Sequence, residues 1–554
     1  MSLLQTPLLQ IIFVAILSAS IWLFYINQNV DNASSTQISQ LPGPPSQSWL
    51  KGNHEQLYSL KDGWEFHETL GKQYGPAVQV KGSLGGKQFY TFDPKAMYHI
   101  LVKHGSLFPP LRLKSGTLIF GEGLLHTEET QHRKQRKMLN PVFSIAHMRS
   151  MMPIFYDVVD QLETSLFQRV PNGQKEIDVL GWMFRTALEL IGQSGFGYSF
   201  DNMKDDVPKH RYSTVVKEFL PAFARLSFAN NYVLPLGLKL FPTNIRTFIM
   251  NVTPWKTLHD VRDMVNYMHQ LSTDIYREKK RALEDGDEAV TNQIGQGKDL
   301  LSIMMKENMK ADDEDKLNEE EMIAQMSTFI FAAMDTTSNS ISRILHLLAN
   351  NQDAQERMRQ EITEARKQRQ GKKLSYDELV ALPYLDAVCR ETLRLYAPVS
   401  YLEKTCIEDV IIPFSRPVRG NNGTEISEIF LPRGTSVMIS ILNANRSAEL
   451  WGSDVLEWKP ERWLSSLPES ITESKAQAGI YAHLMTFSGG SRSCIGFKFS
   501  QLEMKVVTSM LIERFKFSLA PKKKISWQMA IVTSPVVDGG DGHSQLPLIV
   551  ELAT

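Results

Sequence analysis

The segment from Asn318 to about Leu348 constrains the fold more than any other part of the chain. After its polar start it reads MIAQMSTFIFAAMDTTSNSISRILHLLAN, which is apolar on nearly all sides, as in a helix that runs through a core. Asn318 can cap the first turn, and Glu321 three residues later completes a capping box. Other helices must surround this one, so we predict a mainly helical fold with short strands near 77–92 and 430–441.

Charge and cysteine content exclude several classes of protein. The 554 residues carry 60 basic and 61 acidic side chains, and this balance argues against nucleic acid as the main ligand. The three cysteines, with no CxxC spacing, argue against a disulfide framework or a structural zinc site and suit a reducing cytosol. No second linker interrupts the chain, so residues 51–554 are predicted to form one domain.

The N-terminal residues have a different character. From Leu8 to Ile26 the chain has no charged residue, and a helix of that length spans about 28 Å, close to the thickness of the hydrocarbon core of a bilayer. We predict a membrane anchor over residues 1–27, followed by a polar and proline-rich linker over 28–50. A cleaved signal peptide is the alternative, although no Lys or Arg precedes the apolar run.

A cysteine near the C-terminal end lies in an unusually constrained loop, FSGGSRSCIGFKFS, which starts at Phe487. The glycines allow tight backbone conformations, and a long helix is predicted from Ile495 onward. Cys494 therefore stands at a helix N-terminus, where amide N–H groups favour a thiolate. Arg492 adds a positive charge that suits a carboxylate. For a lone cysteine the alternative is a small buried hydrophobic residue.

Phe487, Gly490, Arg492, Cys494 and Gly496 match the pattern F-x-x-G-x-R-x-C-x-G at all five positions. The chain thereby resembles the haem-thiolate monooxygenases, the cytochrome P-450 family, and in particular its fungal microsomal members. The resemblance implies a helical fold around a buried haem, with Cys494 as the axial iron ligand and the other four residues in cofactor binding.

Glu391 and Arg394 lie one helical turn apart in VCRETLRLYAPV, and Arg462 follows in a Pro-Glu-Arg segment. On an exposed helix such a pair would contribute only a few tenths of a kcal/mol. The apolar flanks indicate partial burial, where a paired charge needs further partners. The resemblance implies a structural Glu391–Arg394–Arg462 network that holds the cysteine loop in place.

Asp335 and Thr336 are polar residues in the middle of the apolar helix. A threonine there can simply bond back to a carbonyl one turn earlier and bend the helix. The resemblance implies a catalytic role instead, with Thr336 as a donor on the oxygen side of the haem and Asp335 as a proton relay. Ala333 stands where the family often has glycine, which narrows the space for oxygen.

The basic segment TQHRKQRKMLNPVF supplies candidates for the haem propionates. By resemblance, His132 and Arg136 contact these carboxylates, Arg492 is a third contact, and Lys404 is a fourth. Glu129 stands where the family commonly has glycine. Without the resemblance, this segment would be interpreted as a solvated helix face.

Electrons must come from a separate protein, because the chain has no glycine-rich nucleotide motif after a strand. The resemblance implies a membrane-bound NADPH–haemoprotein reductase. A basic patch of Arg133, Lys134, Lys137, Lys498 and Lys505 is predicted to bind this acidic partner. The resemblance also implies a single-pass protein of the endoplasmic reticulum with its catalytic domain in the cytosol.

The predicted substrate is a lipophilic small molecule, oxidised with O2. By resemblance the pocket is lined by the loop 107–120, Phe331, Val399–Leu402 and Val532–Ser534, which are mostly apolar. We favour a terpenoid-like product of fungal secondary metabolism. The alternatives are oxidation of sterols, alkanes or fatty acids in primary or xenobiotic metabolism, a relative that rearranges substrates or uses peroxide, and a haem-binding sensor without turnover.

Overall fold

The computed structural model describes residues 37–553, apart from 112, 171–172, 209, 227–228, 287–288, 290–293 and 473–477. Within these described residues, no helix has both the length and the apolar character needed to cross a membrane. The predicted anchor, residues 1–27, lies outside them.

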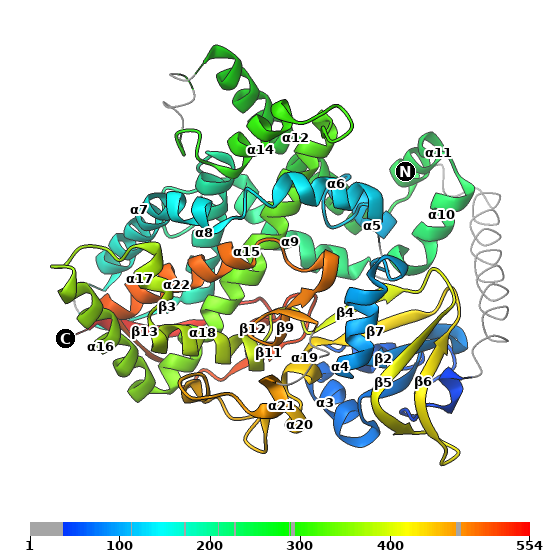
Figure 1. The fold of residues 1–554 in the computed structure, drawn as a ribbon. Helices are drawn as coiled ribbons and strands as arrows, with labels where there is room; N and C mark the ends of the chain where they lie inside the picture. The colour runs from blue at the N-terminus through cyan, green and yellow to red at the C-terminus, as the bar shows by residue number, and fades with distance from the viewer. Residues whose placement is uncertain are drawn as a thin grey trace.

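Helices make up most of the described chain, as predicted, and most of the long ones lie in the upper and left parts of Figure 1. Their bounds are α2 His54–Leu57, α3 Gly63–Tyr74, α4 Pro94–Tyr98, α5 Leu113–Phe120, α6 Glu129–Leu139, α7 Ile145–Arg169, α8 Val179–Leu190, α9 Arg211–Arg225, α10 Leu234–Leu240, α11 Thr243–Val252, α12 Lys256–Asp285, α14 Leu300–Lys310, α15 Glu319–Asn350, α16 Gln352–Gln368, α17 Tyr376–Val380, α18 Pro383–Leu395, α19 Ile441–Asn445, α20 Ala448–Trp451, α21 Glu469–Thr472 and α22 Phe497–Arg514.

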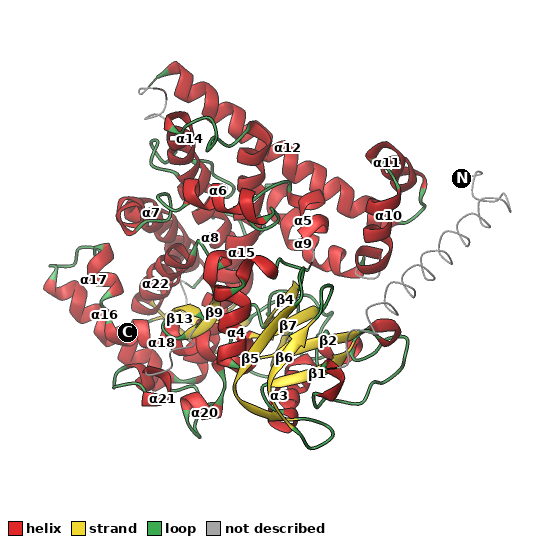
Figure 2. Cartoon of the chain, turned by 45° about the vertical axis from the view of Figure 1, so that its right-hand side comes forward, coloured by secondary structure: helices red, strands yellow, loops and turns green. Residues whose placement is uncertain are grey.

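The strands form small sheets, and the largest described one lies to the lower right of the helices in Figure 2. The strands are β1 Ala77–Lys81, β2 Lys87–Thr91, β3 Lys175–Asp178, β4 Tyr401–Thr405, β5 Val410–Arg419, β6 Glu425–Leu431, β7 Ser436–Ser440, β8 Gly479–Tyr481, β9 Leu484–Gly489, β10 Phe515–Leu519, β11 Ile525–Gln528, β12 Ser534–Val537 and β13 Pro547–Leu552. The largest sheet has the order β1-β2-β7-β4, and β2 and β7 pair in parallel with Gln88 opposite Ser436. This pairing joins the N-terminal part of the domain to its C-terminal half.

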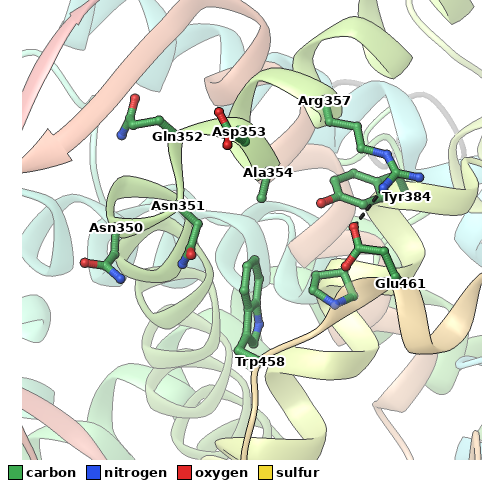
Figure 3. Close-up of a pocket in the computed structure, with 10 residues that line it drawn as sticks. Asn350, Asn351, Gln352, Asp353, Ala354, Arg357, Tyr384, Trp458 and Glu461 are labelled. Atoms are coloured by element: carbon green, nitrogen blue, oxygen red, sulfur yellow. Dashed lines mark hydrogen bonds and ion pairs between the residues drawn. The ribbon is translucent and has the colours of Figure 1, made fainter.

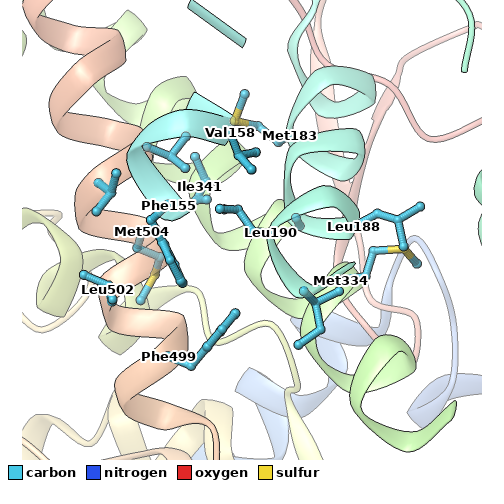
Figure 4. Close-up of a cluster of buried hydrophobic side chains, with 14 of the residues drawn as sticks. Phe155, Val158, Met183, Leu188, Leu190, Met334, Ile341, Phe499, Leu502 and Met504 are labelled. Atoms are coloured by element: carbon cyan, nitrogen blue, oxygen red, sulfur yellow. The ribbon is translucent and has the colours of Figure 1, made fainter. Parts of the chain in front are cut away.

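Helix α15 crosses the core, as its sequence predicts. The Asn318 side chain accepts a hydrogen bond from the Glu321 amide, and the Glu321 carboxylate accepts one from the Asn318 amide, so the capping box is confirmed. Figure 4 shows buried side chains of α7, α8 and α22 gathered around α15. Each such fully buried side chain contributes about 1.5–3 kcal/mol to folding, so this packing fixes the middle of α15 firmly.

Part of the segment predicted as a spacer packs against the domain. Ile38 and Leu41 are 1% and 0% exposed, and both belong to a buried cluster with strands β2 and β7. The amide of Gln79 donates a hydrogen bond to the Pro42 carbonyl oxygen over 2.8 Å. The packed chain therefore extends to Ile38, whereas the predicted domain begins at residue 51.

Candidate active site

The cysteine loop joins β9 to α22 and is shaped by close backbone contacts. The Cys494 amide donates a hydrogen bond to the Phe487 carbonyl oxygen over 2.9 Å. Gly490 has a φ of 70°, and a Cβ added there would lie 1.8 Å from the carbonyl oxygen of Leu101. Any other residue at position 490 would be strained and would collide with the backbone, so this glycine sets the path of the loop.

The two outer residues of the motif have different surroundings. Phe487 is 8% exposed, and its ring contacts those of Tyr481 and Phe497 at centroid distances of 5.3 and 6.1 Å. It anchors the loop on the core. At Gly496, by contrast, a Cβ would make an ordinary contact with Phe143 at 3.8 Å. Among the described residues, steric crowding therefore does not by itself require glycine at position 496.

Cys494 is unusual because its side chain is accessible within buried surroundings. The residue is exposed, yet burial raises the pKa of its thiol, while the Gly496 amide and the charge of Arg136 act in the opposite direction. We infer that the thiol faces an enclosed space. The helix N-terminus was expected to favour the thiolate, but in the protein alone burial outweighs that effect; a metal cation at the sulfur would reverse the balance.

The three residues of the predicted network meet at the carboxylate of Glu391. Arg394 donates to both carboxylate oxygens of Glu391 over 2.8 Å, and Arg462 Nε lies 3.4 Å from Oε1. The amide of Lys459 and the indole N–H of Trp463 donate to the same carboxylate over 3.1 and 2.9 Å. Because the Glu391 and Arg394 side chains are fully buried, each charge depends on these partners.

The middle of α15 is accessible although the helix is buried on both sides of it. Residues 322–330 and 337–345 are buried, whereas Asp335, Thr336 and the alanines before them are only partly buried. The next residue, Thr337, turns away and forms a 3.2 Å hydrogen bond between its hydroxyl and that of Ser500 in α22. Thus α15 touches the helix that follows Cys494 just beyond the Asp335–Thr336 pair.

The Thr336 hydroxyl bonds back along its own helix, as the alternative interpretation of this pair allows. It donates to the Ala332 carbonyl oxygen over 2.7 Å, which leaves the lone pairs of its oxygen as acceptors. Burial raises the pKa of the Asp335 carboxyl to about 7, with a smaller opposing effect of Lys217. An acid with this pKa exchanges protons near neutral pH.

The predicted propionate contacts form a cluster of basic side chains. The 3% exposed His132, the 7% exposed Lys404 and Arg492 come together, and burial and the charges of Arg492, Arg136 and Lys404 lower the His132 pKa to about 3. Arg492 Nη2 donates to the Thr127 carbonyl oxygen over 2.8 Å, while its Nε has no partner in the described part of the chain. Such a cluster suits a ligand with more than one carboxylate.

Arg136 also contacts the cysteine loop directly. It donates to the Ser493 carbonyl oxygen and, over 3.3 Å, to the Ser493 hydroxyl. It therefore links α6 to the residue next to Cys494, a contact that the sequence did not predict.

Aromatic side chains adjoin the accessible part of α15. Phe331 lies 4.5 Å from Phe120 and 6.2 Å from Phe219 between ring centroids. Phe120 ends α5, so much of the predicted pocket loop 107–120 is helical. The amide of Thr533, in one predicted pocket segment, donates over 2.8 Å to the carbonyl oxygen of Pro398, the residue before the segment Val399–Leu402. The surroundings suit an apolar ligand.

A second pocket lies on the far side of the Glu391 network. It has a volume of about 580 Å³ and is lined by the end of α15, by α16, by Tyr384 of α18, and by Trp458 and the Pro460–Trp463 turn. The ion pair of Arg357 with Glu461 lies in its wall (Figure 3). Its wall is mostly polar and does not include Cys494 or α15 residues before Asn350. We therefore assign the chemistry to the cysteine side.

Comparison with known proteins decides the family. A cytochrome P450 family model matches residues 42–535. The chain belongs to the cytochrome P450 family. Cytochrome P450 monooxygenases 91 and 81 of Postia placenta are 48% and 45% identical over 93% and 94% of the chain and 94% of each relative. The ganoderic acid synthetase CYP5150L8 of Ganoderma lucidum is 43% identical over 93% of the chain and 94% of the relative.

P450 enzymes are monooxygenases that bind haem through a thiolate, so this P450 is an oxidoreductase with haem as its cofactor. The residues present fit the group. The exposed Cys494 thiol suits the iron of haem, and the basic cluster around His132 suits its propionates.

Sequence reasoning missed part of the site. The Lys459 amide and the Trp463 indole complete the Glu391 network, but neither lies in the Glu-x-x-Arg pattern. The Lys217 charge acts on Asp335 from α9, more than a hundred residues away along the chain. No local pattern reveals such contacts, because they depend on how distant helices pack.

Proposed function

We propose that this P450 uses O2 to hydroxylate or otherwise oxidise a lipophilic, terpenoid-like molecule of fungal secondary metabolism, with electrons from an NADPH–haemoprotein reductase. The accessible Cys494 thiol in buried surroundings carries this proposal. The phenylalanines next to α15 favour an apolar substrate. The similarity to a ganoderic acid synthetase favours secondary metabolism.

The side chains have distinct roles in this proposal. Haem, held by the Cys494 thiolate, supplies the activation of O2. The Glu391–Arg394–Arg462 network keeps the cysteine loop rigid, and His132, Arg136, Lys404 and Arg492 hold the propionates. Asp335 delivers protons from solvent, because its pKa of about 7 suits transfer in both directions. Thr336 offers its oxygen lone pairs to a water molecule on the same path.

The Asp335→Asn variant is expected to consume NADPH while forming little product. Loss of a proton-transfer group costs about 10²-fold in rate or more. The ratio of product formed to NADPH consumed measures the effect. Product formation by the unmodified enzyme should also change between pH 6 and 8, around the Asp335 pKa of about 7, and this change should be absent in Asp335→Asn.

Thr337→Val is the matched control. The Thr337 side chain is buried, and its hydroxyl forms a hydrogen bond with Ser500 of α22, away from the partly exposed Asp335 and Thr336 side chains. It should keep the product-to-NADPH ratio. An Asp335→Asn enzyme with unchanged coupling and an unchanged pH profile would exclude the relay role.

The reductase is proposed to dock where α6 and the cysteine loop meet. A groove of about 740 Å³ there is lined by Arg133, Arg136 and Lys137 together with Gly490 and Ser491. The prediction that Lys505 belongs to the patch is wrong. Its side chain is 3% exposed, since α17 and α18 cover that side of α22, and it forms a 2.7 Å ion pair with Asp386.

Charge reversal should slow reduction of the haem in a salt-dependent way. We expect Arg133→Glu with Lys134→Glu to lower the rate by about tenfold at low salt, and less at high salt, since such steering is screened. Lys137 is left unchanged because it pairs with Asp315. Stopped-flow reduction under carbon monoxide measures the rate. Lys367→Glu with Lys372→Glu, two exposed lysines at and after the end of α16, is the control with the same change in charge; equal effects of both changes would remove the docking proposal.

We further propose that the protein is held on the endoplasmic reticulum by residues 1–27, with its catalytic domain in the cytosol. Exposed apolar side chains on α10 and α11 favour contact with a membrane surface. Leu240, Phe248 and Val252 are 51%, 65% and 51% exposed. Fractionation of the full chain and of a chain without residues 1–27 tests the anchor.

Product analysis tests the function as a whole. The full chain is co-expressed with a reductase and supplied with terpenoids, sterols, alkanes and fatty acids. Oxygenated terpenoid products that require NADPH support the proposal. Oxygenated products from another class of compound would change the proposed substrate. Turnover driven by peroxide would contradict the need for a reductase. Haem binding without any product would indicate a sensor.

A further inference from the structure

Glu129 lies within the basic cluster that is proposed to hold the propionates. It begins α6, and its Oε2 is 3.7 Å from Nη2 of Arg492. The Glu129 and Arg492 side chains are 27% and 11% exposed, so water screens their interaction only in part. A carboxylate at this position is also favoured by the positive end of the α6 dipole.

The negative charge of Glu129 affects the pKa values of two members of the cluster. Burial lowers the pKa values of Arg492 and Lys404, and Glu129 opposes that effect at both residues. Lys404 lies on β4, so Glu129 acts on groups from the cysteine loop and from the sheet together.

The number of charges points to a specific role. His132, with a pKa of about 3, is uncharged at neutral pH, which leaves Arg136, Lys404 and Arg492 as the cations. The two propionates of haem neutralise two of them, and Glu129 neutralises the third. Without Glu129 the bound cofactor would lie beside one uncompensated positive charge.

We propose that Glu129 is the protein's own counter-ion in the propionate site and that it keeps the reduction potential of the haem low. This inference rests on the haem position given under the proposed function. Reduction adds an electron to the haem, so a fixed negative charge nearby disfavours it. Glu129 also holds the Arg492 guanidinium in place, which makes it a positioning residue rather than a catalytic one.

The test compares two neighbouring carboxylates in the full-length holoenzyme. Glu129→Gln removes the charge inside the cluster, and Glu128→Gln removes the same charge from an exposed side chain one position earlier. Spectroelectrochemical titration of each measures the potential. We expect Glu129→Gln to favour reduction by about tenfold, which is about 59 mV for a one-electron couple. Glu128→Gln should leave the potential unchanged, and Glu129→Asp, which keeps the charge, should stay near the unmodified value.

Equal potentials for Glu129→Gln and Glu128→Gln, or a downward shift in Glu129→Gln, would overturn the proposal. Glu129→Ala supplies a second neutral variant with the same expected rise if the glutamine variant yields no holoenzyme. The carbon monoxide spectrum of each reduced variant is recorded first. If Glu129→Gln shows the red-shifted Soret band but its reduction potential equals that of the unmodified protein, only the role of Glu129 is rejected. If the unmodified protein itself lacks the red-shifted Soret band, the proposed function is rejected.

Discussion

The Cys494→Ser variant is expected to lose at least about 10³-fold of its turnover, equal to about 4 kcal/mol of transition-state stabilisation. A serine hydroxyl is a poor ligand for haem iron and does not donate electron density as a thiolate does. The loop itself should keep its shape, because neither the hydrogen bond from the Cys494 amide to Phe487 nor the left-handed backbone of Gly490 depends on the cysteine side chain. The reduced protein under carbon monoxide should lack the red-shifted Soret band.

Cys406→Ser is the matched control. Cys406 is fully buried and its Sγ donates to the Glu408 carbonyl oxygen over 2.8 Å, a bond that a serine hydroxyl can also form. It should retain both the spectrum and turnover. A Cys494→Ser enzyme with normal turnover would disprove the assignment of this cysteine as the iron ligand.

The Glu391→Gln variant is expected to be destabilised by about 3–5 kcal/mol, because it leaves the fully buried Arg394 without its anion. Arg462 would keep its ion pair with Asp454. A glutamine keeps one acceptor oxygen, but its NH2 group would replace the other and face N–H donors there. These donors are Arg394 and Arg462 at one position, or Arg394 and Trp463 at the other. The free energy of unfolding in urea and the haem content of the purified protein measure the loss.

Haem should be lost as well if the network supports the cysteine loop as proposed. Arg394 donates to the Asn445 carbonyl oxygen, and the Asn445 side chain accepts from the Met485 amide in β9, the strand before that loop.

Glu461→Gln is the control from the same segment. Its ion pair with Arg357 spans 2.7 Å but both side chains are about half exposed, so the expected loss is 0–1 kcal/mol. If Glu391→Gln cost no more than Glu461→Gln, the network would be an ordinary ion pair and would not support the loop.

The features that the sequence predicted well are those with local signals. The capping box of α15 needs two residues three positions apart, and the structure contains it. The apolar pattern of α15 is also a local signal, because it is contained in consecutive residues, and it correctly predicted that this helix lies in the core. The network of Glu391, Arg394 and Arg462 came from the family resemblance, and the structure brings these residues together.

The features that the sequence missed depend on tertiary packing. Lys505 looks like a surface lysine, and only α17 and α18 make it a buried partner of Asp386. The balance of burial against positive charge at the Cys494 thiol likewise depends on how much protein surrounds the loop. Residues 38–42 belong to a segment that we predicted to be a stiff, proline-rich spacer. Ile38 and Leu41 are instead buried in a cluster with residues of β2, β5, β6 and β7.

This packing of Ile38 and Leu41 sets a limit on how far the chain can be shortened. A soluble form designed to start at Lys51 would strip two fully covered side chains from the cluster shared with β2 and β7, at a cost of about 1.5–3 kcal/mol for each. It would also remove the Pro42 carbonyl oxygen, which accepts a hydrogen bond from the Gln79 amide in β1. A design that keeps every residue from Gln37 onward preserves the sheet and is the better starting point for crystallisation.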